Sequence, residues 1–160
     1  MRYSLVMKIT VIATGKPKKG PLLELSDLYQ KRLNAYFPTS IIELPQSKSN
    51  SAVQIKQQES IVQLAKIPNN SVVIALDERG KQPTTQKLAE KIQTWRDTGS
   101  AQLCFIIGGA EGLSDDVRQR ADFILSLSAL TLPHQMARVV MLEQIYRSAT
   151  ILAGHPYHRE

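Results

Sequence analysis

Cysteine and long apolar runs are what this chain of 160 residues has least of. Cys104 is the single cysteine, and one thiol cannot form an intramolecular disulfide. No apolar run approaches the roughly 18 residues that a membrane-spanning helix needs. The first seven residues hold only a brief apolar stretch and no cleavage region of the kind that a signal peptide has. These absences exclude a disulfide-rich secreted scaffold and a helical membrane protein, and they favour a reducing cytoplasm.

Ligand patterns for metals and phosphates are also missing. The three histidines and one cysteine show no spacing typical of metal ligands, so no metal is expected. The run 108–113, GGAEGL, has Ile107 where a dinucleotide-binding fingerprint needs its first glycine, and no Gly-Lys-Ser/Thr follows. Asp115 and Asp116 come shortly afterwards and would repel a phosphate. The glycines therefore either let the backbone approach a ligand without phosphates or make a tight strand-to-helix turn.

Basic residues, in contrast, are in excess. Lysine and arginine number 20 against 14 acidic residues, which gives a formal net charge of +6. Such a balance favours partners that carry phosphate, although spare surface lysines give the same count. Lys16, Lys18 and Lys19 form a local cluster after the first apolar run, either as a contact for RNA or as a solvated loop.

Short apolar runs alternate with amphipathic stretches along the chain. The patterns predict strands at 8–13, 40–44, 71–76, 103–107 and 123–125, and helices at 21–35, 52–66, 84–98 and 134–153, with a short helix after Ser114. This alternation predicts one α/β domain with a mainly parallel sheet and helices on both faces. Ligands of such sheets bind beyond the carboxyl ends of the strands, here the loops after Ala13, Leu76, Ile107 and Leu125. Cys104 is expected to be a small buried hydrophobe inside its strand.

The segment 126–133, SLSALTLP, is unusual for a connection between two elements. It has no Gly, Asn or Asp, and its three leucines predict that it is packed rather than solvated. Its backbone groups must then be satisfied outside a regular ladder, and a bound ligand would serve. An extension of the strand at 123–125 is the alternative. The helix that follows, 134–153, is apolar over a wide arc, which indicates burial either between subunits or within one core.

Three segments together are similar to a known family. IGGAEGL, SLSALTLPHQMARVVMLEQIYRS and the terminal HPYHRE resemble the ribosomal RNA large subunit methyltransferase H family, which belongs to the SPOUT class of knotted methyltransferases. The resemblance covers residues 7–160. Members usually start at the methionine that matches Met7, so residues 1–6 are expected to be an extension, or the true start lies at Met7. The resemblance implies a trefoil knot in the C-terminal half, a homodimer, and S-adenosylmethionine held within the knot.

The resemblance also assigns a cofactor pocket, without a metal. Its residues would be Leu76, Gly108, Gly109, Leu127, Ser128, Ala129, Leu130, Thr131 and Leu132. Glycines admit close approach of the backbone, while leucines and backbone amides suit an adenine ring better than phosphates. Both unusual segments of the sequence would then serve the same ligand.

The implied reaction transfers the cofactor's methyl group to N3 of a pseudouridine in 23S rRNA, on the assembled ribosome. The protein would have to position the two reactants and to deal with the N3 proton, through a base or a cationic environment. Arg138 is a candidate for holding a phosphate or the uracil anion. In the tail 155–160, Tyr157, His158 and Arg159 are expected to fold over the partner subunit's active site and to serve RNA binding or proton handling. His134 either faces the pocket or has a structural role.

Two other functions are compatible with parts of the sequence. A nucleotide-cofactor oxidoreductase would use GGAEGL and bind NAD, whereas a non-catalytic ribosome-binding protein would keep the fold without methyl transfer. The favoured interpretation is a cytoplasmic methyltransferase whose partners are 23S rRNA and a second copy of the chain, not DNA or a membrane.

Overall fold

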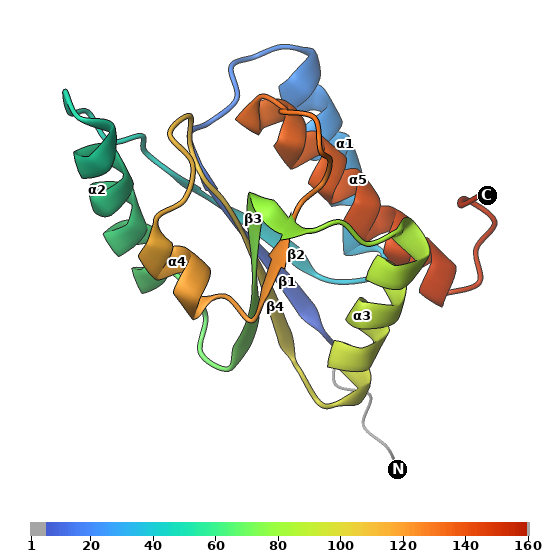
Figure 1. The fold of residues 1–160 in the computed structure, drawn as a ribbon. Helices are drawn as coiled ribbons and strands as arrows, with labels where there is room; N and C mark the ends of the chain where they lie inside the picture. Colours follow the sequence, from blue (N-terminus) through green and yellow to red (C-terminus); the bar gives the residue numbers. More distant parts are fainter. Residues whose placement is uncertain (1–5, 160) are drawn as a thin grey trace.

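The computed structural model describes residues 6–159, so residues 1–5 of the expected N-terminal extension and Glu160 lie outside the described part. Each predicted strand and helix is present. In chain order they are β1 (Lys8–Thr14), α1 (Pro21–Asn34), β2 (Thr39–Leu44), α2 (Ala52–Ala65), β3 (Ser71–Lys81), α3 (Thr85–Asp97), β4 (Gln102–Ile107), α4 (Asp115–Arg120), β5 (Phe123–Leu125) and α5 (His134–Leu152). Figure 1 shows these elements, coloured from the N-terminal blue strand to the C-terminal red helix.

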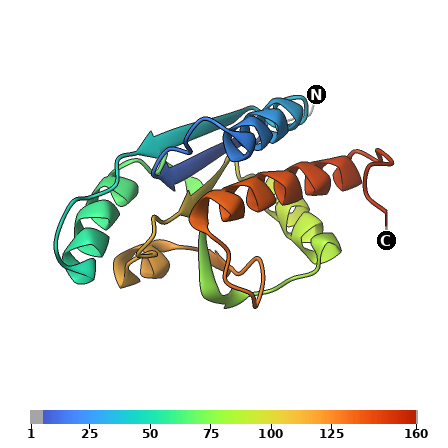
Figure 2. The same cartoon turned by 90° about the horizontal axis from the view of Figure 1, so that it is seen from above.

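The five strands form one sheet in the order β2-β1-β4-β3-β5, and every neighbouring pair is parallel. Side chains alternate between its two faces, because successive residues of a strand point in opposite directions. In β4, Phe105 packs with the helices α1, α3 and α5, while Ile106 packs on the opposite side with Val117 of α4. The two helical layers are visible on either side of the sheet in Figure 2. The predicted α/β class with a covered parallel sheet is confirmed.

Helix α5 lies between α1 and α3 on one face of the sheet. Tyr146 at its centre packs against Tyr29 and Tyr36, with ring centroids 6.2 and 6.0 Å apart. Burial within one chain therefore accounts for much of the wide apolar arc that the sequence shows. Although α5 has 19 residues, neither it nor any other helix within residues 6–159 is long and apolar enough to cross a bilayer.

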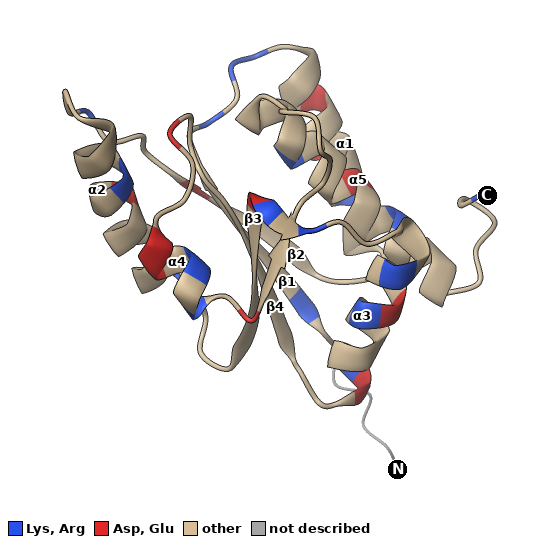
Figure 3. Cartoon of the chain, in the orientation of Figure 1, with Lys and Arg blue, Asp and Glu red and all other residues tan. Residues whose placement is uncertain are grey.

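Side-chain caps define the starts of α3 and α4. Thr84 accepts a hydrogen bond from the backbone N–H of Lys87 at the start of α3, and Ser114 accepts one from Val117 at the start of α4. Such caps satisfy N–H groups that have no partner within the helix. Figure 3 shows that α4 carries acidic residues at its start and basic residues towards its end, an order that the helix dipole favours.

Strand β3 is longer than predicted and bends around β5. Leu125 pairs first with Leu76 and then with Lys81, so residues 77–80 form an irregular bulge between the two pairings. A Cβ atom on Gly80 would lie only 2.5 Å from the carbonyl oxygen of Ile124, which shows how closely the two segments approach. The chain beyond β5 thus leaves the sheet tightly against the returning end of β3, consistent with the predicted C-terminal knot. Residues 77–81, DERGK, are polar and include a glycine, and this composition is typical of a loop. The sequence therefore predicts that the strand ends at Leu76.

Cys104 lies at the centre of the sheet with no exposed surface. Burial raises the pKa of its thiol to about 12, so the group stays protonated and unreactive near neutral pH. The prediction of a small buried hydrophobe is confirmed.

Candidate functional site

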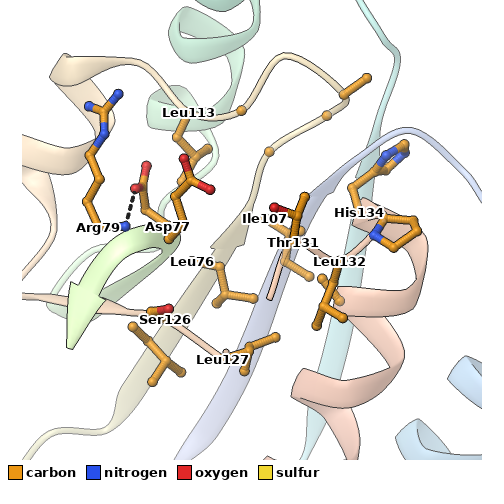
Figure 4. Close-up of a pocket in the computed structure, with 18 of the residues that line it drawn as sticks. Leu76, Asp77, Arg79, Ile107, Leu113, Ser126, Leu127, Thr131, Leu132 and His134 are labelled. Carbon is orange, nitrogen blue, oxygen red and sulfur yellow. Dashed lines mark hydrogen bonds between the residues drawn. The ribbon is translucent and has the colours of Figure 1, made fainter. Parts of the chain in front are cut away.

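A pocket of about 690 Å³ lies at the carboxyl ends of β3, β4 and β5, beside the first turn of α5. Three segments form its walls: residues 76–79 in the bulge of β3, residues 107–113 from the end of β4, and residues 125–134 between β5 and α5. Figure 4 shows Leu76, Leu127 and Leu132 around its apolar part, with His134 at one side. The carboxyl-end loops to which the sequence points, except the loop after Ala13, therefore meet in one cavity.

Most of the predicted cofactor residues line this pocket. They are Leu76, Gly108, Gly109, Leu127, Ser128, Leu130, Thr131 and Leu132. Ala129 is exposed and does not line it. The structure thus brings together residues that are separated by more than fifty positions in the chain, while their role in binding a cofactor stays a prediction.

The glycine turn after β4 is shaped by its own packing. Gly108 faces the backbone of Gly112, and a Cβ atom there would lie 2.8 Å from the carbonyl carbon. Gly112 has a φ of 81°, a region that side chains disfavour, and its N–H donates to the carbonyl of Gly109 at 3.0 Å. A tight strand-to-helix turn therefore accounts for these glycines, and the same turn presents its backbone to the pocket.

Arg118 connects two walls of the pocket through its side chain. Its Nη1 donates to Asp77 Oδ2 at 3.1 Å and to the carbonyl oxygen of Leu113 at 2.6 Å, and its Nη2 pairs with Asp115. The hydrogen bond from Arg118 lowers the pKa of Asp115. This arginine links the end of β3 to α4 and fixes two of the pocket walls relative to each other.

The sequence did not identify the polar side chains in the bulge of β3, which directly follow the predicted strand 71–76. Asp77, Glu78 and Arg79 all line the pocket, and the backbone N–H of Arg79 donates to Asp77 Oδ1 at 2.9 Å (Figure 4). Their position directly after a buried parallel strand was the available signal, because ligand sites lie at such strand ends. The side chains add charge of both signs to a pocket that the resemblance describes as apolar.

The connection 126–133 is only partly packed. Leu127 and Leu132 are half-buried, but Leu130 is 76% exposed, so the prediction of three packed leucines is wrong for that residue. Strand β5 ends at Leu125, and the alternative of an extended strand is wrong as well. Ser128 organises the connection instead, since its Oγ accepts from the N–H of Leu130 at 2.9 Å and its carbonyl accepts from Ser126 Oγ at 3.1 Å. Exposed Leu130 is therefore available for a ligand to cover.

Arg138 does not reach the pocket. It is 2% exposed and lies between α5 and α1, where its Nε donates to Ser26 Oγ at 3.0 Å and its Nη2 to Glu43 Oε1 at 3.1 Å. A buried guanidinium needs such partners, because an unpaired charge in the interior is costly. The predicted contact of Arg138 with a phosphate or a uracil anion is not supported in this chain, and its position is that of a structural residue.

The tail packs back along the C-terminal half of α5, away from the pocket. The hydroxyl of Tyr157 donates to Glu143 Oε1 at 3.1 Å, and its ring packs against Tyr146 with centroids 4.7 Å apart. Arg147 donates to Glu143 through Nε at 2.9 Å and lies 3.3 Å from His158 Nδ1, while Arg159 is exposed. Glu143 and Arg147 follow His134 by 9 and 13 residues of α5, which corresponds to about 14 and 20 Å along the helix. Tyr157 and His158 thus contact Glu143 and Arg147, and they do not reach the pocket of their own chain.

The chain combines an all-parallel sheet with a pocket between the glycine turn 108–113 and the connection 126–133. This combination can be compared with known families. Residues 7–158 match the family described as "Predicted SPOUT methyltransferase". The fold agrees with two solved structures, a probable methyltransferase from Bordetella pertussis (TM-score 0.54, 12% identity, 91% of this chain and 98% of that one) and a probable methylase family protein from Haemophilus influenzae (TM-score 0.56, 14% identity, 97% and 72%). The chain belongs to the SPOUT methyltransferase family.

Curated relatives match the chain over nearly its full length. The "Ribosomal RNA large subunit methyltransferase H" of Bradyrhizobium diazoefficiens is 43% identical over 159 residues, covering 96% of this chain and 99% of that protein. The protein of the same name from Methylorubrum populi is 44% identical over 160 residues, with 96% and 97% covered. The family resemblance seen in the sequence is confirmed.

Proposed function

We propose that this chain is an S-adenosylmethionine-dependent methyltransferase of the cytoplasm that methylates N3 of a pseudouridine in 23S rRNA, within the assembled ribosome. One observation carries the proposal: eight residues assigned to the cofactor line a single cavity of about 690 Å³ in a chain of the SPOUT family. The name of the curated relatives supports an rRNA substrate. Residues 7–159 would act as one catalytic domain, with the tail as part of its active site.

The pocket suits the proposed cofactor in size and in lining. Its volume lies within the range of about 300 to 1,000 Å³ that is usual for small-molecule sites. Leu76, Leu127 and Leu132 offer apolar contacts for the adenine ring, and the backbone groups of 126–132 offer hydrogen bonds to its edge. The carboxylate of exposed Glu78 suits ribose hydroxyls or an ammonium group. No described group of three or more His, Cys, Asp or Glu residues is arranged to hold a metal ion.

When bound, the cofactor supplies a methyl group on a sulfonium, which already has a good leaving group. The chain then has to hold the target base against the pocket, keep water out and accept the N3 proton as the new N–C bond forms. His134 is the titratable side chain at the start of α5 that borders the pocket. Its half-buried imidazole is positioned to contact the uracil ring or to pass its proton on to solvent.

The active site is proposed to contain the tail of a second copy of the chain. A chain's own tail is held by Glu143 and Arg147 in the C-terminal half of α5, about 14 to 20 Å along the helix from His134 at its own pocket. Burial raises the pKa of Tyr157 to about 12, so its hydroxyl keeps its proton and anchors the tail to Glu143. His158 and exposed Arg159 are then the tail residues that can meet RNA in a partner's pocket. Leu25, Leu28 and Met136 expose apolar surface on α1 and α5 that a homodimer would cover.

The substrate claim is tested by methyl transfer from labelled cofactor to ribosomes that lack the modification. The proposal expects label at N3 of one pseudouridine of 23S rRNA in ribosomes, and little label on free 23S rRNA. Label at another base, or on free RNA alone, would contradict it. Ribosome binding without transfer would leave the chain a non-catalytic binding protein, and tight binding of NAD in place of S-adenosylhomocysteine in a calorimetric titration would favour an oxidoreductase.

A further inference from the structure

A groove of about 1030 Å³ lies beside the pocket, at the carboxyl ends of β1 and β2. Two loops form its sides: residues 15–22, which lead into α1, and residues 43–48, which follow β2. Lys16, Lys18 and Lys19 come from the first loop and Lys48 from the second, and all four side chains are exposed. Figure 3 shows the basic residues of the first loop along the connection above the sheet.

The charge of the groove is not neutralised by its own residues. None of the four lysines forms an ion pair with any described residue. Glu43 is the one acid that lines the groove, and it is already paired with Arg138 at 3.1 Å. Four positive charges therefore face one cavity, which favours a polyanion over a neutral or basic partner.

The loops that carry the lysines are fixed to the fold. The N–H of Gly15 donates to the carbonyl of Leu44 at 2.8 Å, which ties the two sides of the groove together. The carbonyl of Gly15 accepts from Gln135 Nε2 of α5 at 3.4 Å, and Pro17 is buried between the exposed lysines. Because these anchors hold the loop in one shape, little ordering of the backbone would oppose the binding of a ligand.

The groove continues into the pocket, because His134 lines both. None of the residues that line the groove is Phe, Tyr or Trp, and His134, at the border with the pocket, carries the one aromatic ring among them, so the groove itself offers no run of rings on which successive bases could stack. Lysine ammonium groups bind phosphate oxygens as point charges, and such contacts position a strand without reading its sequence. The chemistry therefore fits the backbone of a nucleic acid strand whose target base enters the neighbouring pocket.

We propose that this groove holds the sugar-phosphate backbone of the substrate RNA next to the target nucleotide. The inference rests on the proposed function, since it takes the substrate to be RNA. It assigns to Lys16, Lys18, Lys19 and Lys48 the positioning of the strand, and it leaves the chemistry to the pocket and the tail.

The test compares two triple variants of the full chain with equal loss of charge. The groove variant carries Lys16→Gln, Lys18→Gln and Lys19→Gln. The control carries Lys8→Gln, Lys66→Gln and Lys87→Gln, three exposed lysines that line neither cavity. For the groove variant, we expect KM for ribosomes to rise at least about tenfold and the slope of log Kd against log salt to fall by about 2 to 3. Its kcat and its affinity for S-adenosylhomocysteine should stay near the wild-type values, and the control should stay near wild type throughout.

Each other outcome overturns the inference. Equal losses in both variants would mean that net charge alone draws the ribosome, and an unchanged KM would mean that the groove is not used. A groove variant that binds isolated 23S rRNA normally but loses ribosomes would point to a ribosomal protein as the occupant. Cosedimentation with ribosomes keeps this test separate from the proposed function: a wild-type chain without methyl transfer would refute that function, while the groove variant would still be judged by its binding.

Discussion

The two ends of α5 lie in very different surroundings. At its first turn, His134 borders a pocket lined by glycines, leucines and the charged side chains of Asp77, Glu78 and Arg79. From its middle onwards, Glu143 and Arg147 hold Tyr157 in a cluster of charged and aromatic side chains. The first end suits the binding of a small ligand, and the second fixes a short terminal segment that would otherwise fray. One chain thus offers the two parts of the proposed site about 14 to 20 Å apart along the helix, and we propose that a second chain joins them.

Removal of residues 157–160 deletes most of the tail and leaves the pocket residues of the same chain in place. Of the changes described, it should have the largest effect on turnover. We expect kcat to fall at least about a hundredfold, because positioned groups that handle protons contribute that much or more. The affinity for S-adenosylhomocysteine should stay near the wild-type value, since the tail does not reach the pocket of its own chain. Single-turnover methyl transfer and calorimetry measure the two quantities. Unimpaired turnover would show that the tail has no part in the reaction.

Arg138, in the second turn of α5, should affect stability and not binding. Replacement of Arg138 by alanine leaves Ser26 and Glu43 without their partner, and we expect the free energy of unfolding to fall by about 2 kcal/mol. The loss stays moderate because the side chain of Glu43 is 29% exposed and can be solvated. Urea denaturation measures it. An Arg138→Met variant that keeps wild-type stability and cofactor affinity but loses turnover would restore the catalytic role predicted from the sequence.

Gly108→Val alters the glycine turn that lines the pocket. The added side chain would meet the backbone of Gly112, with the first carbon 2.8 Å from its carbonyl carbon, so the turn must shift. A misfit of this kind costs about 1 to 3 kcal/mol, and we expect the affinity for S-adenosylhomocysteine to fall about tenfold or more. Ala129→Val is the matched control, because Ala129 is exposed outside the pocket. Equal losses in the two variants would show that Ala129 belongs to the site after all.

The smallest effect is expected beneath the glycine turn, at Glu59. This side chain is 5% exposed, its Oε2 has no hydrogen-bond partner within residues 6–159, and burial raises the pKa of its carboxyl group. The folded state therefore holds the proton more tightly than the unfolded state, so wild-type stability falls as the pH rises from the unfolded pKa through the folded one. Glu59→Gln lacks this loss and should be about 1 kcal/mol more stable at neutral pH.

The difference between wild type and Glu59→Gln should vanish in acid, where the wild-type carboxyl group is protonated in both states. Urea denaturation at several pH values measures this. A gap of the same size at every pH would contradict the account, because it would show that packing and not ionisation separates the two side chains.

The sheet and the pocket could be predicted from the sequence because their signals are local. Strands buried on both faces read as continuous apolar runs, as in KITVIA, SVVIAL and LCFII, and their alternation with helices sets the direction of each strand. Ligand loops follow from strand direction, which is why the loops after Leu76 and Ile107 were expected to meet. The identity of the ligand came from the resemblance and not from these patterns.

The partners of buried polar groups could not be predicted in this way. Arg138 is bonded to Ser26 and Glu43, which lie 112 and 95 positions away in the chain, and no local pattern reports such a pairing. On α2, the spacing of Ile55, Val62 and Ala65 predicts an apolar face, and this is wrong because Val62 is 41% exposed.

The buried face of α2 is polar instead. It carries Glu59, Ser60 and Gln63, and Gln63 Nε2 donates to Thr14 Oγ1 at 2.8 Å. Hydrogen bonds to the end of β1 decide which side of this helix is buried, and hydrophobic spacing cannot report them.

The central claim, that each active site joins the pocket of one chain to the tail of another, is tested most directly by mixing two impaired variants at a cofactor concentration below the wild-type Kd, where weakened cofactor binding limits the activity of the second. One lacks residues 157–160 and keeps its pocket, and the other carries Gly108→Val and keeps its tail. After the two are co-refolded at equal concentration, half of the dimers contain one chain of each kind and hence one complete site. The account predicts methyl transfer at about a quarter of the wild-type rate. A mixture no more active than the sum of its two components would contradict it.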